Sequence, residues 1–270
     1  MRILIVSGSR ADLGLLHCPE KVLREDGFEV GLCIFHDANF SGAFKLVSDR
    51  LESYEMLLIL GDRWEILAAA TAAHLQRIPI AHIGGGDVTE GSYDDAMRDC
   101  ISRMANINFT TSFSATGRLV SLGYRNVHLV GNPGVDYIMH EKWQREREIA
   151  EPYVLVSYQP ETIDDTVCLE AVEAAINGRR AIWISPNPDR GSERIQYGES
   201  YSHDRFLNLM YHCDEFIGNS SAMFYEAPFL KLGGVKCRVI GKRQKGRVIP
   251  WGDGKASERI RDVLRLWPSS

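Results

Sequence analysis

Short apolar segments alternate with helical segments along almost the whole chain, and this alternation restricts the possible folds more than any other feature. In the first half, the segments predicted as strands are residues 2–8, 29–35, 54–61, 78–84, 107–112 and 127–131. The segments predicted as helices lie between them, at residues 11–25, 63–77, 92–105 and 114–123. Most of the strand segments are apolar at successive positions, which is typical of a parallel sheet covered by helices on both faces. The pattern therefore predicts a doubly wound α/β domain.

The alternation continues after a predicted linker at Glu151-Pro152. A polar helix is expected before this linker, from Gly134 to Ile149, and Pro152 cannot continue it. Further strands are expected at residues 153–158, 181–185, 215–217 and 236–241, and further helices at residues 166–178, 203–213, 222–232 and 257–267. We therefore expect two Rossmann-like domains, residues 1–150 and 151–270, that face each other across a cleft. The last helix can pack on either domain.

Composition argues against several classes of protein. No apolar run approaches the length of about 18 residues that a membrane-spanning helix needs, and no signal peptide precedes the first strand, so we expect a cytoplasmic protein. The six cysteines include no CxxC pair, and no clustered ligand set has zinc or iron spacing. We therefore predict no metal and no other cofactor, although His36, His82 and His203 stay possible as single ligands. His82 is more typical of a satisfied buried histidine.

Polar residues gather where the predicted strands end, and in a doubly wound fold ligands bind beyond those carboxyl ends. The segments concerned are residues 7–12, 36–37, 61–63, 84–87, 158–162, 185–191 and 218–221. Arg10 and Arg63 could pair with a diphosphate, whereas Asp62 and Asp87 could transfer protons. The alternative is that each aspartate caps the next helix and each arginine closes a salt bridge. That alternative does not explain why all of them share one edge.

The segment from Asp214 to Arg247 is predicted to bind the anionic part of a ligand. It contains the end of a strand, a turn with Ser220 and Ser221, and a helix with Glu226 near its start. Backbone N–H groups and the positive end of the helix dipole would point at one spot beside the two hydroxyls. A serine-capped helix without a ligand is the alternative. The basic segment 241–247 favours the anion site. Because the whole chain has a net charge of −5, broad nucleic-acid binding is not expected.

Seven sequence blocks resemble a known family. They are SGSRADLGLL, LGDRWEILAAA, HIGGGDVTEGSYDDAMRDCIS, VGNPGVD, SPNPDRGSERI, IGNSSAMFYEAP and GKRQKGR, in this order. Together they resemble the UDP-N-acetylglucosamine 2-epimerases, most closely the hydrolysing branch of sialic-acid biosynthesis, over nearly the whole chain. The resemblance implies a glycosyltransferase-B-like fold with UDP held mainly by the second domain. It also implies elimination of UDP across C1 and C2 and then addition of water, which gives N-acetylmannosamine.

The resemblance assigns roles to residues by motif. The catalytic residues that it implies are Asp62, Asp94 and Asp87. The predicted substrate-binding residues are Arg10, Ala11, His36, Arg63, Gln159, Asn187, Gly191, Ser220, Ser221, Glu226 and Arg243. Within this set, the two serines are expected at the diphosphate, Glu226 at the ribose and Arg243 on the uridine side.

Two positions depart from the family pattern. Gly84 stands where the family usually has glutamate or another protonatable side chain, and Gln159 stands where it usually has histidine. Glutamine can hold a sugar or phosphate oxygen, but it cannot transfer a proton near neutral pH. The chain is also shorter than typical relatives, mainly between His36 and Leu51, where the family has a loop and a helix on the substrate side.

Three functions therefore stay open. They are a hydrolysing 2-epimerase, a diverged glycosyltransferase or nucleotide-sugar hydrolase on the same scaffold, and a non-catalytic protein that binds UDP sugars. In each case the expected partner is a UDP sugar, and neither nucleic acid nor a membrane is expected. The resemblance also implies a homodimer, since members of that family usually pair through helices of the first domain, and the small residues of the stretch from Ile66 to Ala73 would let helices approach closely.

Overall fold

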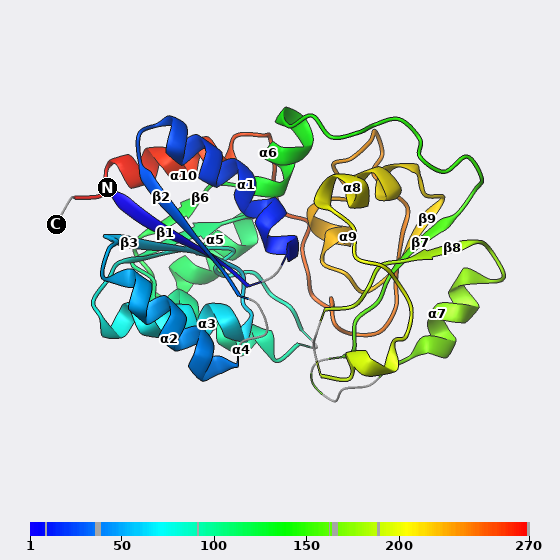
Figure 1. Cartoon of the computed structure of the whole chain (residues 1–270), viewed down its shortest axis with the longest axis horizontal. Helices are drawn as coiled ribbons and strands as arrows, with labels where there is room; N and C mark the ends of the chain where they lie inside the picture. The colour runs from blue at the N-terminus through cyan, green and yellow to red at the C-terminus, as the bar shows by residue number, and fades with distance from the viewer. Residues whose placement is uncertain are drawn as a thin grey trace. The chain divides into compact units, whose positions relative to one another are not determined.

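The computed structural model describes residues 1–8, 10–35, 39–90, 92–161, 163, 167–187 and 190–268, and for Arg10 and Ala11 it describes only the backbone. The chain divides into two compact units (Figure 1). Unit 1 comprises Met1–Val88, Asp94–His140 and Pro250–Ser270, and unit 2 comprises Thr89–Tyr93 and Glu141–Ile249. The predicted domains 1–150 and 151–270 lack the short excursion Thr89–Tyr93. Of the two places left open for the last helix, the structure has the one in unit 1, to which the chain returns at Pro250.

Unit 1 is built on a sheet of six parallel strands. Its order is β2-β1-β3-β4-β5-β6, formed by Arg2–Ser7 (β1), Glu29–Ile34 (β2), Met56–Leu60 (β3), Ile80–Ile83 (β4), Ile107–Thr110 (β5) and Val127–Leu129 (β6). Successive residues of β1 enter two different hydrophobic cores, with Ile3 and Ile5 in one and Leu4 and Val6 in the other. Burial on both faces explains why these strands are apolar at successive positions.

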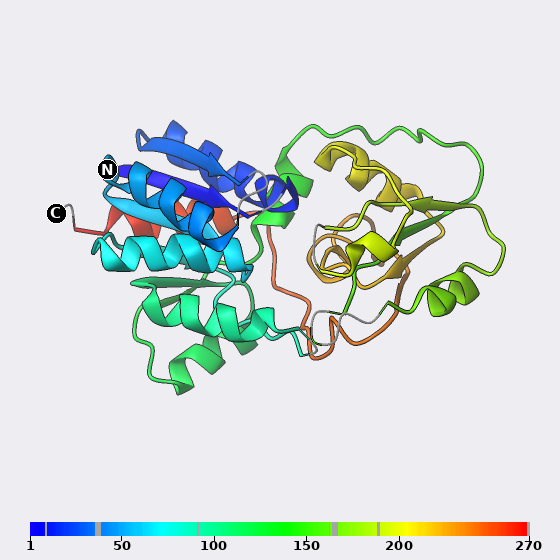
Figure 2. The same cartoon turned by 60° about the horizontal axis from the view of Figure 1, so that its bottom comes forward.

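Helices cover both faces of this sheet (Figures 1 and 2). They are α1 (Arg10–Glu25), α2 (Phe40–Leu51), α3 (Trp64–Leu75), α4 (Asp94–Met104), α5 (Phe113–Ser121), α6 (Pro133–His140) and α10 (Ala256–Arg265). Leu23 of α1 and Ile260 of α10 fill the core on one face. Val47 of α2 and Ile66 of α3 fill the core on the other face. The C-terminal helix therefore packs in unit 1.

Unit 2 contains a second sheet of four parallel strands in the order β10-β9-β7-β8. The strands are Val154–Ser157 (β7), Ala181–Trp183 (β8), Glu215–Gly218 (β9) and Cys237–Val239 (β10). Its helices are α7 (Leu169–Ile176), η1 (Ser192–Arg194, a 3-10 helix), α8 (His203–His212) and α9 (Ala222–Tyr225). The α/β class with two parallel sheets is confirmed.

Three helical segments differ from the prediction. Helix α2 was not predicted, and Asn39 caps it by accepting the Gly42 N–H at 2.8 Å. The predicted helix 134–149 ends at His140. The predicted helix 222–232 is limited to the four residues of α9, because Pro228 removes an N–H and disfavours helical geometry before it.

The small-residue stretch of α3 has a different role from the one expected. Its residues Ile66, Ala68, Ala69, Ala70, Ala72 and Ala73 are buried inside unit 1. Helix α3 packs there against α2 and α4 as well as against the sheet. Small side chains let these helices approach within one chain, so this stretch cannot form the predicted dimer surface.

Candidate functional site

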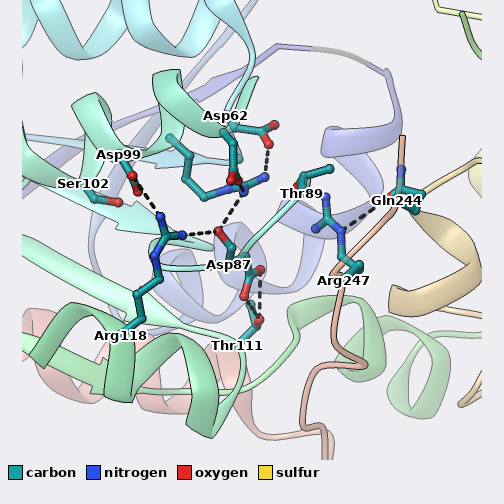
Figure 3. Close-up of polar contacts among 12 residues, drawn as sticks. Asp62, Asp87, Thr89, Asp99, Ser102, Thr111, Arg118, Gln244 and Arg247 are labelled. Atoms are coloured by element: carbon teal, nitrogen blue, oxygen red, sulfur yellow. Dashed lines mark hydrogen bonds and ion pairs between the residues drawn. The ribbon is translucent and has the colours of Figure 1, made fainter. Parts of the chain in front are cut away.

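A buried arginine organises the carboxylates at the end of the unit 1 sheet. Arg98 of α4 is 2% exposed. Its guanidinium donates to the carboxylate of Asp62, which follows β3 (Figure 3). The same group donates to Asp95 Oδ1 at 2.6 Å and to the backbone carbonyl of Asp87 at 2.8 Å. One buried cation thus fixes Asp62 and the main chain of Asp87, two of the predicted catalytic residues.

The carboxylate of Asp87 is held by a hydroxyl group. Thr111, at the end of β5, donates from Oγ1 to the two carboxylate oxygens at 3.0 and 3.1 Å (Figure 3). Arg118 of α5 donates to the carbonyl of Asp87 at 3.1 Å and pairs with Asp99 at 2.9 Å. Asp87 is 9% exposed, so three neighbouring elements determine its position.

His82 supports the turn that carries Asp62. It lies on β4 and is fully buried, with Nε2 at 2.8 Å from the carbonyl of Gly61 and Nδ1 at 3.1 Å from the Ser102 hydroxyl. Burial lowers the pKa of His82 to about 4, so the ring is neutral near pH 7. In that form Nε2–H donates to Gly61, and Nδ1 accepts from Ser102. The prediction of a satisfied buried histidine is confirmed.

Gly84 contributes only backbone to this site. Its φ is +86°, in the left-handed region that side chains other than glycine rarely adopt. A Cβ atom built on Gly84 would lie 3.9 Å from Asp87 Oδ2, and the next nearest atom is the Gly61 nitrogen at 4.0 Å. The side-chain group nearest to the position of the missing side chain is therefore the Asp87 carboxylate.

Arg63 and Asp94 begin helices in the same unit. Arg63 is the residue before α3, makes no side-chain capping bond, and pairs with Glu65 at 3.0 Å, whereas Asp62 pairs with Arg98. Asp94 is the first residue of α4, and it lies in the same helix as Arg98. A negative charge in the first helical turn is stabilising in itself, so position alone does not separate a catalytic from a structural role for Asp94.

Three strand ends of unit 2 are joined by hydrogen bonds through Gln159. Its backbone N–H donates to Asn219 Oδ1 at 2.7 Å, and its carbonyl accepts from Asn219 Nδ2 at 2.8 Å. Its side-chain oxygen accepts the backbone N–H of Asn187 at 2.8 Å. Asn219 is fully buried directly before Ser220. Gln159 therefore orders the segments that follow β7, β8 and β9.

The basic segment after β10 joins this arrangement. Gln244 Nε2 donates to the carbonyl of Asn219 at 2.9 Å. Arg243, which is 9% exposed, donates to the carbonyl of Pro160 at 2.9 Å. Glu161 accepts the backbone N–H of Lys242 at 3.0 Å. The structure thus brings Arg243 to the strand ends that carry Gln159 and Ser220.

Ser220, Ser221 and Glu226 surround the short helix α9. The Ser220 hydroxyl accepts the Ala222 N–H at 3.3 Å, and Ser221 begins α9 without a side-chain capping bond. Glu226 follows the helix and is 6% exposed. Burial raises the pKa of Glu226 to about 7.

The predicted site residues therefore divide between the units. Unit 1 contains Asp62, Arg63, Asp87 and Asp94, and unit 2 contains Gln159, Asn187, Gly191, Ser220, Ser221, Glu226 and Arg243. Gly191 is buried with φ +89°, just before η1. His36 and the side chains of Arg10 and Ala11 lie outside the described residues.

Sequence reasoning missed Arg98 and Thr111 as parts of the site. Arg98 lies three residues after Asp95 in a predicted helix, a spacing at which opposite charges meet, so this pair was open to prediction. Its burial was not. In the described part of the chain, no group of His, Cys, Asp and Glu side chains is arranged to hold a metal ion. Among the helices described there, none is long and apolar enough to cross a membrane.

A model of the family described as UDP-N-acetylglucosamine 2-epimerase matches residues 43–249. The polysialic acid biosynthesis protein P7 of Escherichia coli is 31% identical over 226 residues, which cover 73% of this chain and 57% of that protein. The hydrolysing UDP-N,N'-diacetylbacillosamine 2-epimerase of Legionella pneumophila is 25% identical, and the match covers 99% of this chain and 96% of that protein. The chain spans 57% to 66% of the length of the first curated relatives that it matches.

Solved structures have the same fold. The Methanocaldococcus jannaschii UDP-GlcNAc 2-epimerase in complex with UDP-GlcNAc and UDP matches with a TM-score of 0.81 and 15% identity, over 99% of this chain and 100% of that one. The Neisseria meningitidis UDP-GlcNAc 2-epimerase bound to UDP-GlcNAc matches with a TM-score of 0.77 and 15% identity, over 98% and 100% of the two chains. These matches confirm the predicted glycosyltransferase-B-like fold class.

Proposed function

Because the chain belongs to the UDP-N-acetylglucosamine 2-epimerase family, we propose that it converts a UDP-linked N-acetylhexosamine and water into UDP and the free sugar with inverted configuration at C2. The proposed substrate is UDP-N-acetylglucosamine and the product N-acetylmannosamine. The observation that carries the proposal is the buried Arg98, which holds the Asp62 carboxylate and the main chain of Asp87 with one guanidinium. A fixed pair of carboxylates is what proton removal and proton return at one carbon require.

In this proposal, unit 2 binds the nucleotide. Ser220 and Ser221 donate to the diphosphate, Arg243 supplies positive charge, and the Glu226 carboxylate accepts the two ribose hydroxyls. The hydrogen bonds that order Asn219 directly before the serines support this assignment. Gln159 uses its side-chain oxygen on Asn187, which leaves its NH2 group as a donor for a phosphate oxygen.

Unit 1 carries the proton chemistry in this proposal. A carboxylate removes the C2 proton, a C1–C2 double bond forms, and the C1–O bond to UDP breaks. An acid then gives a proton to C2 from the opposite face, and the hydroxyl of water adds to C1. The proton that water loses and the proton held by the base pass to solvent or to the acid, which restores both groups. Asp62 is assigned as the base because its ion pair with Arg98 favours the charged form. Asp87 or Asp94 returns the proton, and the Asp87 carboxylate lies beside Gly84, where the family usually has a protonatable side chain.

A second candidate substrate carries another acetamido group. The Legionella pneumophila relative, which matches almost the full length of both chains, is named for UDP-N,N'-diacetylbacillosamine. A relative of Campylobacter jejuni is named for the GDP- and UDP-linked forms of the same sugar. The reaction at C1 and C2 would be unchanged, and the sugar would differ at C4, which carries the second acetamido group, and at C6, which lacks the hydroxyl group.

The biological setting is part of the proposal. One relative is named for polysialic acid biosynthesis, which supports a role in supplying N-acetylmannosamine to that kind of pathway. A reaction between a nucleotide sugar and water also fits the cytoplasmic location that we propose.

Proton NMR of each candidate nucleotide sugar incubated with the protein tests the proposal. We expect release of UDP together with N-acetylmannosamine, or with the C2-inverted diacetamido sugar if that substrate is preferred. Release of free N-acetylglucosamine would identify hydrolysis at C1 and overturn the epimerase assignment. UDP binding without turnover of either compound would identify a binding protein.

A further inference from the structure

Arg247 ends the basic segment and connects it to a distant part of the chain. Its Nη2 donates to the Thr89 hydroxyl at 2.6 Å, and its Nη1 donates to the Tyr225 hydroxyl at 3.0 Å. Its Nε donates to Gln244 Oε1 at 3.0 Å (Figure 3). The guanidinium also lies over the Tyr225 ring, 5.3 Å from its centroid. These contacts use the three nitrogens of the guanidinium, each in a different direction.

A continuous set of hydrogen bonds leads from Arg247 to the proposed nucleotide site. Gln244, which binds Arg247 through Oε1, uses Nε2 to bind the carbonyl of Asn219. Asn219 precedes Ser220. Its side-chain oxygen accepts the Gln159 N–H, and its side-chain nitrogen donates to the Gln159 carbonyl. Thr89, Gln244 and Asn219 are all at least nine-tenths buried, so water does not compete freely for these bonds.

Thr89, at the other end of this series of hydrogen bonds, is close in sequence to the proposed catalytic carboxylates. Thr89–Tyr93 is a short excursion into unit 2, and the residues on either side, Val88 and Asp94, belong to unit 1. Asp87 is two residues before Thr89, and Asp94 starts α4 directly after the excursion. The excursion is anchored a second time, because Glu90 pairs with Lys245 in an antiparallel bridge.

We infer that Thr89 and Arg247 are positioning residues, which couple nucleotide binding in unit 2 to the placement of the loop that carries Asp87 and Asp94. This inference rests on the proposed function. A diphosphate bound beside Asn219 restrains Gln244, Gln244 restrains Arg247, and Arg247 fixes the Thr89 hydroxyl. Nucleotide binding then stabilises the excursion Thr89–Tyr93, and through the chain the segment from Asp87 to Asp94, in addition to the bonds that Arg98, Thr111 and Arg118 provide.

Hydrogen exchange measured by mass spectrometry tests the coupling without requiring turnover. In the wild type, UDP is expected to slow exchange about fivefold or more in a peptide covering residues 85–98, as well as in a peptide covering residues 215–226. Thr89→Val removes the hydroxyl and keeps the shape of the side chain, so it should abolish the effect at 85–98 and leave that at 215–226. Thr89→Ser keeps the hydroxyl and should behave as the wild type.

The outcomes separate the coupling from the proposed function. If UDP protects 85–98 equally in Thr89→Val and Thr89→Ser, or does not protect it in the wild type while protecting 215–226, the coupling is wrong and the proposed function stands. If UDP does not bind to the wild type at all, both are wrong. Arg247→Met is the second test, and it should reproduce Thr89→Val.

The ratio of the effects on kcat and KM gives a second test, because a loss of stability alone would not lower kcat selectively. Thr89→Val should lower kcat about tenfold while KM changes by less than about threefold, because ground-state binding is kept and the reacting geometry is lost. A parallel change of both constants in Thr89→Val and Thr89→Ser would contradict the coupling.

Discussion

At the scale of single residues, Glu226 has the surroundings that most alter its chemistry. The side chain is buried, and none of the described residues forms an ion pair with it. Burial raises the pKa of Glu226 to about 7, so the group is partly protonated at neutral pH in the absence of a ligand. Ribose hydroxyls that donate to the carboxylate would stabilise its charged form.

The first prediction is therefore that UDP binding depends on pH through Glu226. Affinity should fall by up to about tenfold for each pH unit below 7, because binding must then displace one proton, and should level off above pH 7. Calorimetry across pH 5 to pH 8.5 in wild type and Glu226→Gln checks this. The phosphate of UDP titrates in both proteins, so the difference between them isolates Glu226. Identical pH dependence in both would remove Glu226 from the site.

The raised pKa of Glu226 also leads to a prediction for the stability of the protein without ligand. The pKa of Glu226 is raised in the folded state, so the folded state binds more protons than the unfolded state between pH 4.5 and pH 7. The contribution of Glu226 to the free energy of unfolding is fully present below its pKa in the unfolded state, 4.5. It is lost as pH rises through the folded-state pKa of about 7, by about 3 kcal/mol in total. Urea unfolding should show this loss in wild type and not in Glu226→Gln. A stability that rises with pH relative to Glu226→Gln would contradict it.

The second residue-scale feature is the shared use of Arg98 by Asp62 and Asp95. If Asp62 is the base, Asp62→Asn should keep UDP binding and lower turnover by about 100-fold or more. Asp95→Asn removes a charge from the same guanidinium but no proposed proton carrier, and should cost about tenfold or less. Steady-state kinetics of the two variants compares them directly. Equal losses would show that Asp62 acts only as a partner of Arg98.

At the scale of elements, the attachment of α10 depends on one carboxylate. Asp136 of α6 is 2% exposed and accepts the N–H groups of Ala256 and Ser257 at 3.1 and 2.6 Å. Burial raises the pKa of Asp136, although these hydrogen bonds act in the opposite direction. Lys255 provides no side-chain cap for α10, so Asp136 takes that role from another helix.

Asp136→Ala should therefore lower the free energy of unfolding by about 2 to 4 kcal/mol, because two buried donors lose a charged acceptor. Asp253→Ala, which removes a surface pair with Arg259, is the matched control and should cost about 1 kcal/mol or less. Urea denaturation of the two variants measures both values. A cost for Asp136→Ala no larger than that for Asp253→Ala would show that α10 is held by its apolar face alone.

Elements with strong local patterns were predictable from the sequence, and elements decided by tertiary contacts were not. The positions of the central strands, such as β1, β3 and β7, followed from apolar runs, because burial on two faces strongly restricts the residue type. The polar residues 141–149 resembled a helix, but Asn208 binds their carbonyls at 144 and 146 and keeps them irregular. The small residues of α3 indicated close helix packing without indicating that the partner lies in the same chain.

At the scale of the whole molecule, no local sequence pattern indicates the excursion of the chain into unit 2 at Thr89–Tyr93, and the return at Pro250 was predictable only as one of two possible places for the last helix. Those changes depend on contacts between residues more than a hundred positions apart, such as Thr89 with Arg247. The same holds for the candidate site in unit 1, where Asp62 was predicted and its buried partner Arg98 was not. The residue types show which side chains could take part in proton transfer or ligand binding, whereas long-range packing determines which of those side chains contact each other.

A homodimer stays a prediction at this scale, with a surface other than the buried stretch of α3. Light scattering at about 10 μM protein should give twice the chain mass of 30.4 kDa, because closed twofold association is the commonest state of such proteins. UDP at saturation should leave this mass unchanged. A mass of one chain under both conditions would contradict the dimer.

In the proposed mechanism, the carboxylates of unit 1 remove and return a proton at C2. Turnover of UDP-N-acetylglucosamine in deuterium oxide tests it most directly, with proton NMR of the free sugar. The mechanism predicts one deuteron at C2 of N-acetylmannosamine in every turnover, since the returned proton comes from solvent. A free sugar that keeps its original hydrogen at C2 would contradict the elimination route and would show that the C1–O bond is cleaved directly.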